Sequence, residues 1–136
     1  MAKFKWAGLL ALIVFSINSI HAASPRTNYL LHCSGCHLGN GEGAPPNVPT
    51  LVGELGRMLA VPQMRSYLAR IPGASQAPLS DGELTEVINW LLLEYNADTL
   101  PEKFQQLSVE EVSAARKNIL ADPLKYRTQY WKAYAN

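Results

Sequence analysis

The sequence has no excess of charge of either sign and very few side chains that bind metals or act as nucleophiles. Its 136 residues include 12 Lys and Arg against 11 Asp and Glu, with only two cysteines and three histidines. A nucleic-acid surface needs a basic excess, so the near balance argues against that class of protein. We recognise no acid, base and nucleophile set typical of an enzyme, and we predict no turnover.

Long apolar runs are also missing, except at the N-terminus. Lys3 and Lys5 precede an almost uncharged run over residues 6–20, and Ala22 and Ala23 follow it. This order is typical of a secretory signal peptide. The run of about 15 residues is shorter than the roughly 20 of a transmembrane helix, so an uncleaved membrane anchor is the less favoured alternative. We predict that residues 1–23 are a signal peptide and that the protein is exported to the periplasm.

Without residues 1–23 the chain would keep 113 residues, with 10 Lys and Arg against 11 Asp and Glu, because Lys3 and Lys5 are removed. This length suits one small domain, near the lower limit for a core that is stable alone. A covalently held cofactor inside the core would help such a chain considerably.

No stretch alternates apolar and polar residues as a half-buried strand does, so we predict an all-α fold. The helical periods and their start signals predict five helices, over residues 25–36, 62–71, 80–96, 108–120 and 123–134. Ser80 with Glu83, and Ser108 with Glu111, have the spacing of capping boxes.

Residues 38–53 are rich in glycine and proline and predict no regular structure. An irregular segment of this length is unusual in a small domain unless it wraps something.

The two cysteines and one histidine form the sequence Cys33-Ser34-Gly35-Cys36-His37. The pattern C-x-x-C-H is the recognition pattern for c-type haem attachment. On a helical turn, cysteines three residues apart can reach two neighbouring vinyl groups, and the histidine becomes the proximal ligand of the iron. We therefore predict one covalently bound haem c, held by Cys33 and Cys36, with His37 as the proximal ligand.

Three other interpretations of this motif were considered. A structural zinc site needs four ligands, and His32 beside the other three is too crowded to complete one. A thioredoxin-like dithiol would sit where a strand meets a helix, and no strand is predicted here. A plain structural disulfide remains open.

Beyond this motif, the chain resembles the class I cytochromes c. Pro49 and Leu51 follow His37 by twelve and fourteen residues, as in the family's Pro-x-Leu, and residues 53–57, GELGR, are similar to its Gly-x-x-Gly-Arg. The resemblance implies that the carbonyl of Pro49 accepts a hydrogen bond from His37, and that Arg57 pairs with a haem propionate. For Arg57 the alternative is a solvated loop charge.

Two further segments extend the resemblance. Residues 64–73, MRSYLARIPG, are similar to the family's distal helix, which implies that Tyr67 and Leu68 face the haem. Residues 80–96 resemble its C-terminal helix, which implies that Trp90 crosses the N-terminal helix near Tyr29.

The resemblance covers residues 25–96 and implies a cytochrome c domain over residues 24–97, built around one haem. Residues 98–136 would be a C-terminal helical extension, whose apolar positions we list as Leu107, Val109, Val112, Ala115 and Ile119. We expect it to pack on the domain. An aromatic-rich docking surface around Tyr126, Tyr130, Trp131 and Tyr134 is the alternative.

The chain departs from the family where the second axial ligand is expected. The family has a methionine after its Pro-Gly, and here Pro72-Gly73-Ala74-Ser75 is followed by Gln76. Met64, one turn before Leu68 on the same helix face, is the substitute we consider first. A weak bond from Gln76 and an iron left open or bound to water are the alternatives.

The resemblance implies an electron carrier that passes single electrons from a dehydrogenase-type donor to a redox acceptor such as an oxidase, through a surface around Cys33, Ser34 and Gln76. A haem-based ligand-binding or sensing module with an open distal site is one alternative, and a cytochrome subunit of a dehydrogenase complex is another.

Overall fold

The computed structural model describes residues 23–45 and 47–132. The predicted signal peptide, apart from Ala23, lies outside these described residues, as does Tyr134. Within them every regular element is a helix, and only an isolated bridge joins Ala44 to Val48. The all-α prediction is therefore confirmed. No helix among the described residues has both the length and the apolar character needed to cross a membrane.

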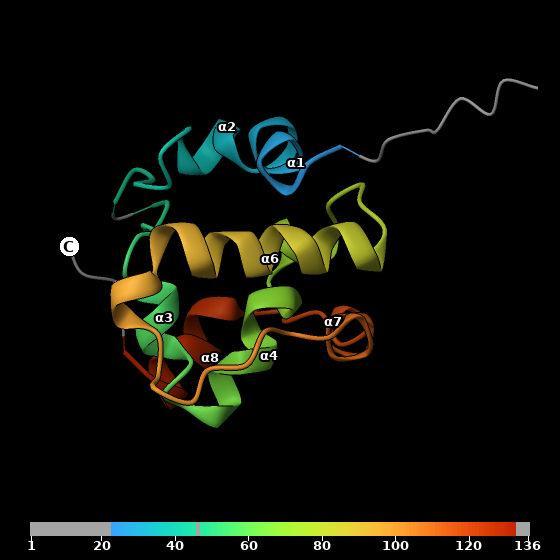
Figure 1. The fold of residues 1–136 in the computed structure, drawn as a ribbon. Helices are drawn as coiled ribbons and strands as arrows, with labels where there is room; N and C mark the ends of the chain where they lie inside the picture. Colours follow the sequence, from blue (N-terminus) through green and yellow to red (C-terminus); the bar gives the residue numbers. More distant parts are fainter. Residues whose placement is uncertain (1–22, 46, 133–136) are drawn as a thin grey trace, which may run out of the picture.

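The described residues form short helices linked by irregular segments (Figure 1). In chain order they are α1 (Pro25–His32), α2 (Ser34–His37), α3 (Glu54–Met58), α4 (Pro62–Arg70), α5 (Pro72–Ser75), α6 (Asp81–Tyr95), the 3-10 turn η1 (Ala97–Thr99), α7 (Val109–Arg116) and α8 (Pro123–Tyr130). Both predicted capping boxes are present, at the starts of α6 and α7.

Helix α6 is the centre of the fold. Helices α1 and α2 lie on one side of it, and α3, α4, α7 and α8 lie on the other (Figure 1). Its apolar residues are buried along most of its length, so both layers pack against it. The rings of Tyr29 on α1 and Trp90 on α6 are 5.4 Å apart, which confirms the predicted helix crossing.

The helices differ in several places from those predicted from the sequence. The last one, expected over residues 123–134, ends at Tyr130. The helix expected over residues 25–36 is interrupted at Cys33, whose carbonyl accepts from the amides of both Cys36 and His37 and so begins a new turn. A short helix, α5, lies between the helices predicted over residues 62–71 and 80–96, where no helix was predicted. Pro72 is in its first turn, where a missing N–H costs nothing. Helix α7 ends at Arg116 rather than near Leu120, because the amide of Leu120 bonds instead to the carbonyl of Arg70 on α4.

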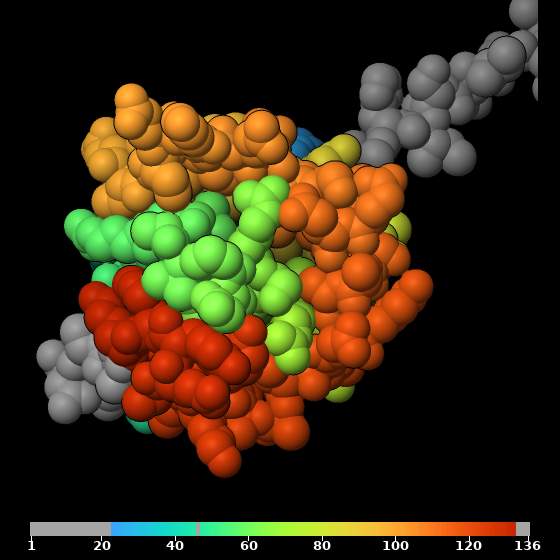
Figure 2. Space-filling view, turned by 90° about the horizontal axis from the view of Figure 1, so that it is seen from below, coloured from blue at the N-terminus to red at the C-terminus, as the bar shows by residue number. Residues whose placement is uncertain are grey.

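The C-terminal extension packs on the rest of the protein. Leu107, Val112 and Ala115 are buried against α4 and α6, but Val109 and Ile119, expected on the same face, are 44% and 47% exposed. Leu120 is buried in their place because the chain turns toward α4 after Arg116. In Figure 2 the extension (orange to red) borders the surface of α3 and α4 (green) above, on the right and below. The domain boundaries themselves stay a prediction.

Candidate haem-attachment site

A cavity between the two layers contains the motif that the sequence singled out. Cys33, Cys36 and His37 line it together with His32, and these are the lining side chains able to bind a metal. The rest of the lining is apolar and comes from Leu51, α3, α4, α6 and residues 71–77. Among the described residues no cluster of three or more His, Cys, Asp or Glu side chains is arranged to hold a metal ion.

The two cysteines lie one helical turn apart and are not joined to each other. Cys33 is half-buried and Cys36 is exposed, and both thiols are free. The amide of His37 donates to the carbonyl of Cys33 over 3.0 Å, which closes the turn. Burial raises the pKa of the Cys33 thiol, and the neighbouring Cys36 adds to the rise. The turn therefore presents two free thiols and one imidazole to the same cavity.

His37 is held at one ring nitrogen. Its Nδ1 lies 3.1 Å from the carbonyl oxygen of Pro49. That carbonyl can only accept, so Nδ1 carries the proton and Nε2 is left with its lone pair free for an iron. Burial lowers the pKa of His37, and the bond to Pro49 partly opposes this. The neutral form that a metal ligand requires is thus favoured.

The segment that carries Pro49 folds back under His37. The amide of Gly43 donates to the carbonyl of His37 over 3.0 Å, and the bridge between Ala44 and Val48 closes the loop. Gly43 has φ +68°, and a Cβ there would lie 2.6 Å from the carbonyl oxygen of Pro49. The absence of a side chain at Gly43 therefore lets the chain bring Pro49 to the imidazole.

The side chain of Asn96 fixes the far end of this segment. Its amide nitrogen donates to the carbonyls of Leu51 and Leu91, and its oxygen accepts from the amide of Gly56. The residue is 1% exposed. The sequence analysis did not single out Asn96. The feature that could have pointed to it is a polar residue directly after the apolar helix α6. Through these hydrogen bonds Asn96 connects Leu51, which lines the cavity, to α3 and α6.

Other predicted haem-contacting residues divide into two groups. Leu51 and Leu68 line the cavity as expected. Arg57 does not: its side chain is 58% exposed and lies 3.7 Å from the carboxylate of Glu54. Arg57 lies on α3 and not in a loop, and its pairing with a haem propionate stays a prediction. Tyr67 is buried outside the lining and stacks on Tyr126, with ring centroids 6.0 Å apart.

The candidates for a second axial ligand also lie outside the cavity lining. Gln76 is exposed. Met64 is fully buried on α4, one turn before Leu68, which does line the cavity. Met58 is buried with its sulfur 3.9 Å from Nη1 of Arg127. Ligation by Met64 therefore stays a prediction, and it requires this side chain, which lies outside the cavity lining, to move into the cavity.

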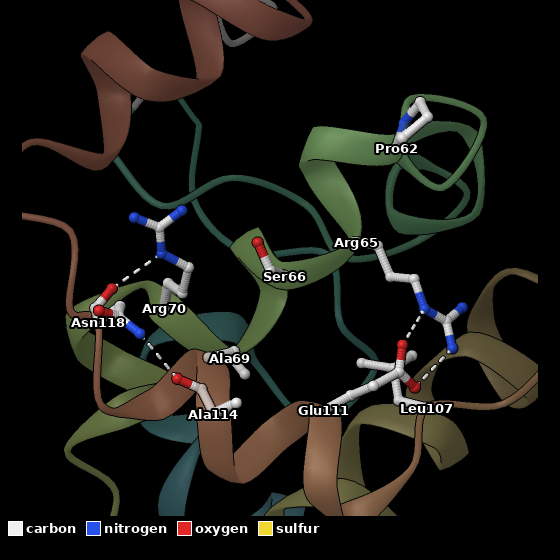
Figure 3. A pocket seen from close by; sticks show the side chains of 10 residues that line it. Pro62, Arg65, Ser66, Ala69, Arg70, Leu107, Glu111, Ala114 and Asn118 are labelled. Atoms are coloured by element: carbon white, nitrogen blue, oxygen red, sulfur yellow. Dashed lines mark hydrogen bonds and ion pairs between the residues drawn. The ribbon is translucent and has the colours of Figure 1, made fainter.

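A larger groove lies between α4 and α7, and it carries none of the motif residues (Figure 3). It has a volume of about 530 Å³ and is lined by Arg65 and Arg70, among others. Arg65 is bound by Glu111, and Arg70 donates to the carbonyl of Asn118 (Figure 3). These bonds join the extension to α4.

The residues of the first cavity fit a covalently attached haem. Two free thiols one turn apart, a neutral imidazole with Nε2 available, and a mainly apolar lining are the donor set that such a group needs. Haem c therefore fits this chain on the chemistry of its own side chains.

Comparison with known proteins points the same way. The chain is 28% identical to cytochrome c-552 of Thermus thermophilus, over 102 aligned positions that take in 62% of this chain and 78% of that protein. Cytochrome c-552 from a further strain of the same species matches at the same identity, with 69% of its length covered. No protein-family model matches the chain.

Proposed function

We propose that this protein is a mono-haem c-type cytochrome that carries single electrons in the periplasm. The observation that supports this most directly is the contact of His37 with Pro49, beside two free thiols in one cavity. A haem bound there would supply the one-electron redox chemistry. The similarity to the Thermus cytochromes c-552 supports the same class.

The residues of the chain have separate tasks in this proposal. Cys33 and Cys36 would hold the haem, each through one thioether bond made by adding its thiol across a vinyl group, sulfur to one carbon and hydrogen to the other. His37 would bind the iron through the lone pair of Nε2; its bond to Pro49 fixes the ring and would increase its donor strength. The apolar lining excludes water.

The partner surface in this proposal surrounds the attachment motif. Cys36 and Gln76 are exposed. Leu31 and Leu38, on either side of the motif, are 68% and 46% exposed and offer apolar contact area. Redox encounters bury little surface, so a small patch of this kind suffices for a periplasmic dehydrogenase as donor and an oxidase as acceptor. We propose no turnover by the protein itself.

An absorption spectrum of the protein expressed with the periplasmic haem-attachment machinery tests the proposal. We expect haem bands that remain with the polypeptide after denaturation and acid–acetone extraction, and a reversible one-electron titration. The double variant Cys33→Ala, Cys36→Ala should lose the covalent haem, while Gly39→Ala should keep it. A wild-type protein without bound haem would exclude this function.

A second candidate function is a haem-based ligand-binding or sensing module. The cavity lining favours this function. Among the described residues that line the cavity, those able to bind a metal all lie in the segment His32–His37. If no side chain occupies the distal position of the iron, a small ligand such as carbon monoxide can bind there. Rapid binding of carbon monoxide to the reduced protein would support this function. A low-spin spectrum that becomes high-spin in Met64→Ala would instead identify Met64 as the ligand.

A further inference from the structure

We infer that Arg116, on the C-terminal extension, is a positioning residue for the haem site, because it holds one wall of the cavity in place. We call residues 71–79 the wall segment. This segment contributes Ile71, Gly73, Ala74 and Ala77 to the cavity lining. The inference rests on the proposed function, since the wall matters only if a haem lies behind it.

The guanidinium of Arg116 binds the backbone of the wall segment directly. Nε donates to the carbonyl of Ser75 over 2.9 Å, Nη2 to that of Ala77 over 2.7 Å, and Nη1 to that of Leu79 over 2.7 Å. Nη1 also donates to the carboxylate of Asp81, 2.9 Å away, at the start of α6. The side chain of Arg116 is only 16% exposed, so these bonds are partly shielded from water.

Besides Arg116, the second half of the wall segment is held by short-range backbone bonds and by the burial of Ala77 and Leu79. After α5 ends at Ser75, the backbone bonds donated within the segment are those from Gln76 to Pro72, from Ala77 to Ala74 and from Leu79 to Ala77, and Pro78 has no amide to donate. The side chain of Ala77 faces the cavity while its carbonyl accepts from Arg116. A displacement of Arg116 would therefore move the cavity lining through a single residue, Ala77.

Arg116 can act as a fixed point because α7 is itself anchored. Arg65 on α4 binds the carboxylate of Glu111 and the carbonyls of Gln105 and Gln106. The side chain of Asn89 on α6 exchanges two hydrogen bonds with the backbone of Leu107. Arg116 is the last residue of this anchored helix, next to the wall segment.

Loss of Arg116 should make the wall open more often without unfolding the rest of the protein. More frequent opening lets water and small anions reach the haem. Water stabilises the more highly charged oxidised state, so the reduction potential should fall. These two effects distinguish a positioning role from a contribution to stability alone.

The experiment compares two arginine variants of the full-length haem-loaded protein. Arg116→Ala removes four hydrogen bonds between the extension and the wall region. Arg65→Ala also removes four, between the extension and α4, and Arg65 lines the groove of Figure 3 and not the haem cavity. Arg116→Lys retains the charge and can satisfy some of the same carbonyls.

The measurements are the rate of cyanide binding to the oxidised haem, the reduction potential and the melting temperature. Since the wall segment loses its three hydrogen bonds from Arg116, Arg116→Ala should bind cyanide about ten-fold faster or more, at a lower potential. Arg65→Ala should lower the melting temperature but leave the rate and the potential near wild type. Arg116→Lys should lie between wild type and Arg116→Ala.

Two results would overturn the inference. If Arg116→Ala and Arg65→Ala share the same cyanide rate and potential, Arg116 contributes only to stability, and the proposed function is unaffected. If Arg116→Ala does not fold, an unchanged rate and potential in Arg116→Lys leads to the same conclusion. A wild-type protein without covalent haem would instead exclude the proposed function and this inference together.

Discussion

The hydroxyl of Tyr29 donates a hydrogen bond to the carbonyl oxygen of Leu38, the residue that follows His37. Leu38 has φ 61°, a conformation that is unusual for a residue with a side chain. Tyr29 is fully buried, and burial raises the pKa of its phenol to about 12. The hydroxyl therefore stays protonated as a donor and stabilises the strained turn after the haem-attachment motif.

Tyr29→Phe should destabilise the protein, because it removes this donor and leaves the Leu38 carbonyl without it. We expect a loss of about 1–2 kcal/mol in the free energy of unfolding, measured by urea denaturation. Tyr95→Phe is the control, since its hydroxyl bonds to the carbonyl of Gly39 at an exposed position. Equal losses in both variants would contradict a special role for Tyr29.

Gly43→Ala should disturb the contact between His37 and Pro49. The added Cβ would lie 2.6 Å from the carbonyl oxygen of Pro49, and φ at this position is +68°. We expect a loss of about 2 kcal/mol or more in stability, together with a lower yield of covalent haem. Both are measured on purified protein, by thermal melting and by absorption per polypeptide.

The matched control for this substitution is Gly39→Ala. A Cβ there meets nothing nearer than a side-chain atom of Leu30 at 3.9 Å. The variant should behave like wild type. Normal haem yield and stability in Gly43→Ala would show that the loop can shift without loss of the proximal geometry.

Asn96→Ala should be among the most destabilising single substitutions. It leaves the carbonyls of Leu51 and Leu91 and the amide of Gly56 without their side-chain partner in a buried place. We expect a loss of about 3 kcal/mol or more, since each buried group left unpaired costs about 1–3 kcal/mol. Asn118→Ala, which removes one exposed side-chain bond to the carbonyl of Ala114, should cost far less. Chemical denaturation of both variants measures the difference.

Acid should destabilise the contacts that hold the extension. The pKa of Asp81 is lowered by hydrogen bonds from Ser113 and then Arg116, and the pKa of Glu111 is lowered mainly by its bond from Arg65. A carboxylate whose pKa is lower in the folded than in the unfolded state stabilises the fold at pH values above its unfolded-state pKa. This contribution is lost as the pH falls through the folded-state pKa.

Since the ordinary values are 3.8 for Asp and 4.5 for Glu, we expect these contributions to be constant from pH 7 to pH 5 and to decline below about pH 4.5. Thermal melting as a function of pH measures the decline. The double variant Asp81→Asn, Glu111→Gln should start from a lower melting temperature and lose less on acidification. An unchanged acid response in this variant would show that other carboxylates dominate.

The starts of α6 and α7 and the attachment motif could be predicted because their signals are local, whereas the short helices α3 and α5 were not predicted. The side chain of Ser80 accepts from the amide of Glu83, three residues away, and the same holds for Ser108 and Glu111. Cys33, Cys36 and His37 occupy a single turn. Interactions over three or four residues depend on backbone geometry that the sequence already implies, so they are visible before the fold is known.

The walls of the cavity could be decided only by the tertiary structure. Asn96 reaches Leu51 across 45 positions of the chain, and Arg116 reaches Ser75 across 41. No sequence pattern identifies the bonding partners of either residue, because any polar side chain can bond to whichever carbonyl the packing brings near it. The same packing leaves the side chain of Arg57 exposed and buries Met64 outside the cavity lining. The sequence by itself determined which residues can attach a haem; the long-range contacts decided what surrounds it.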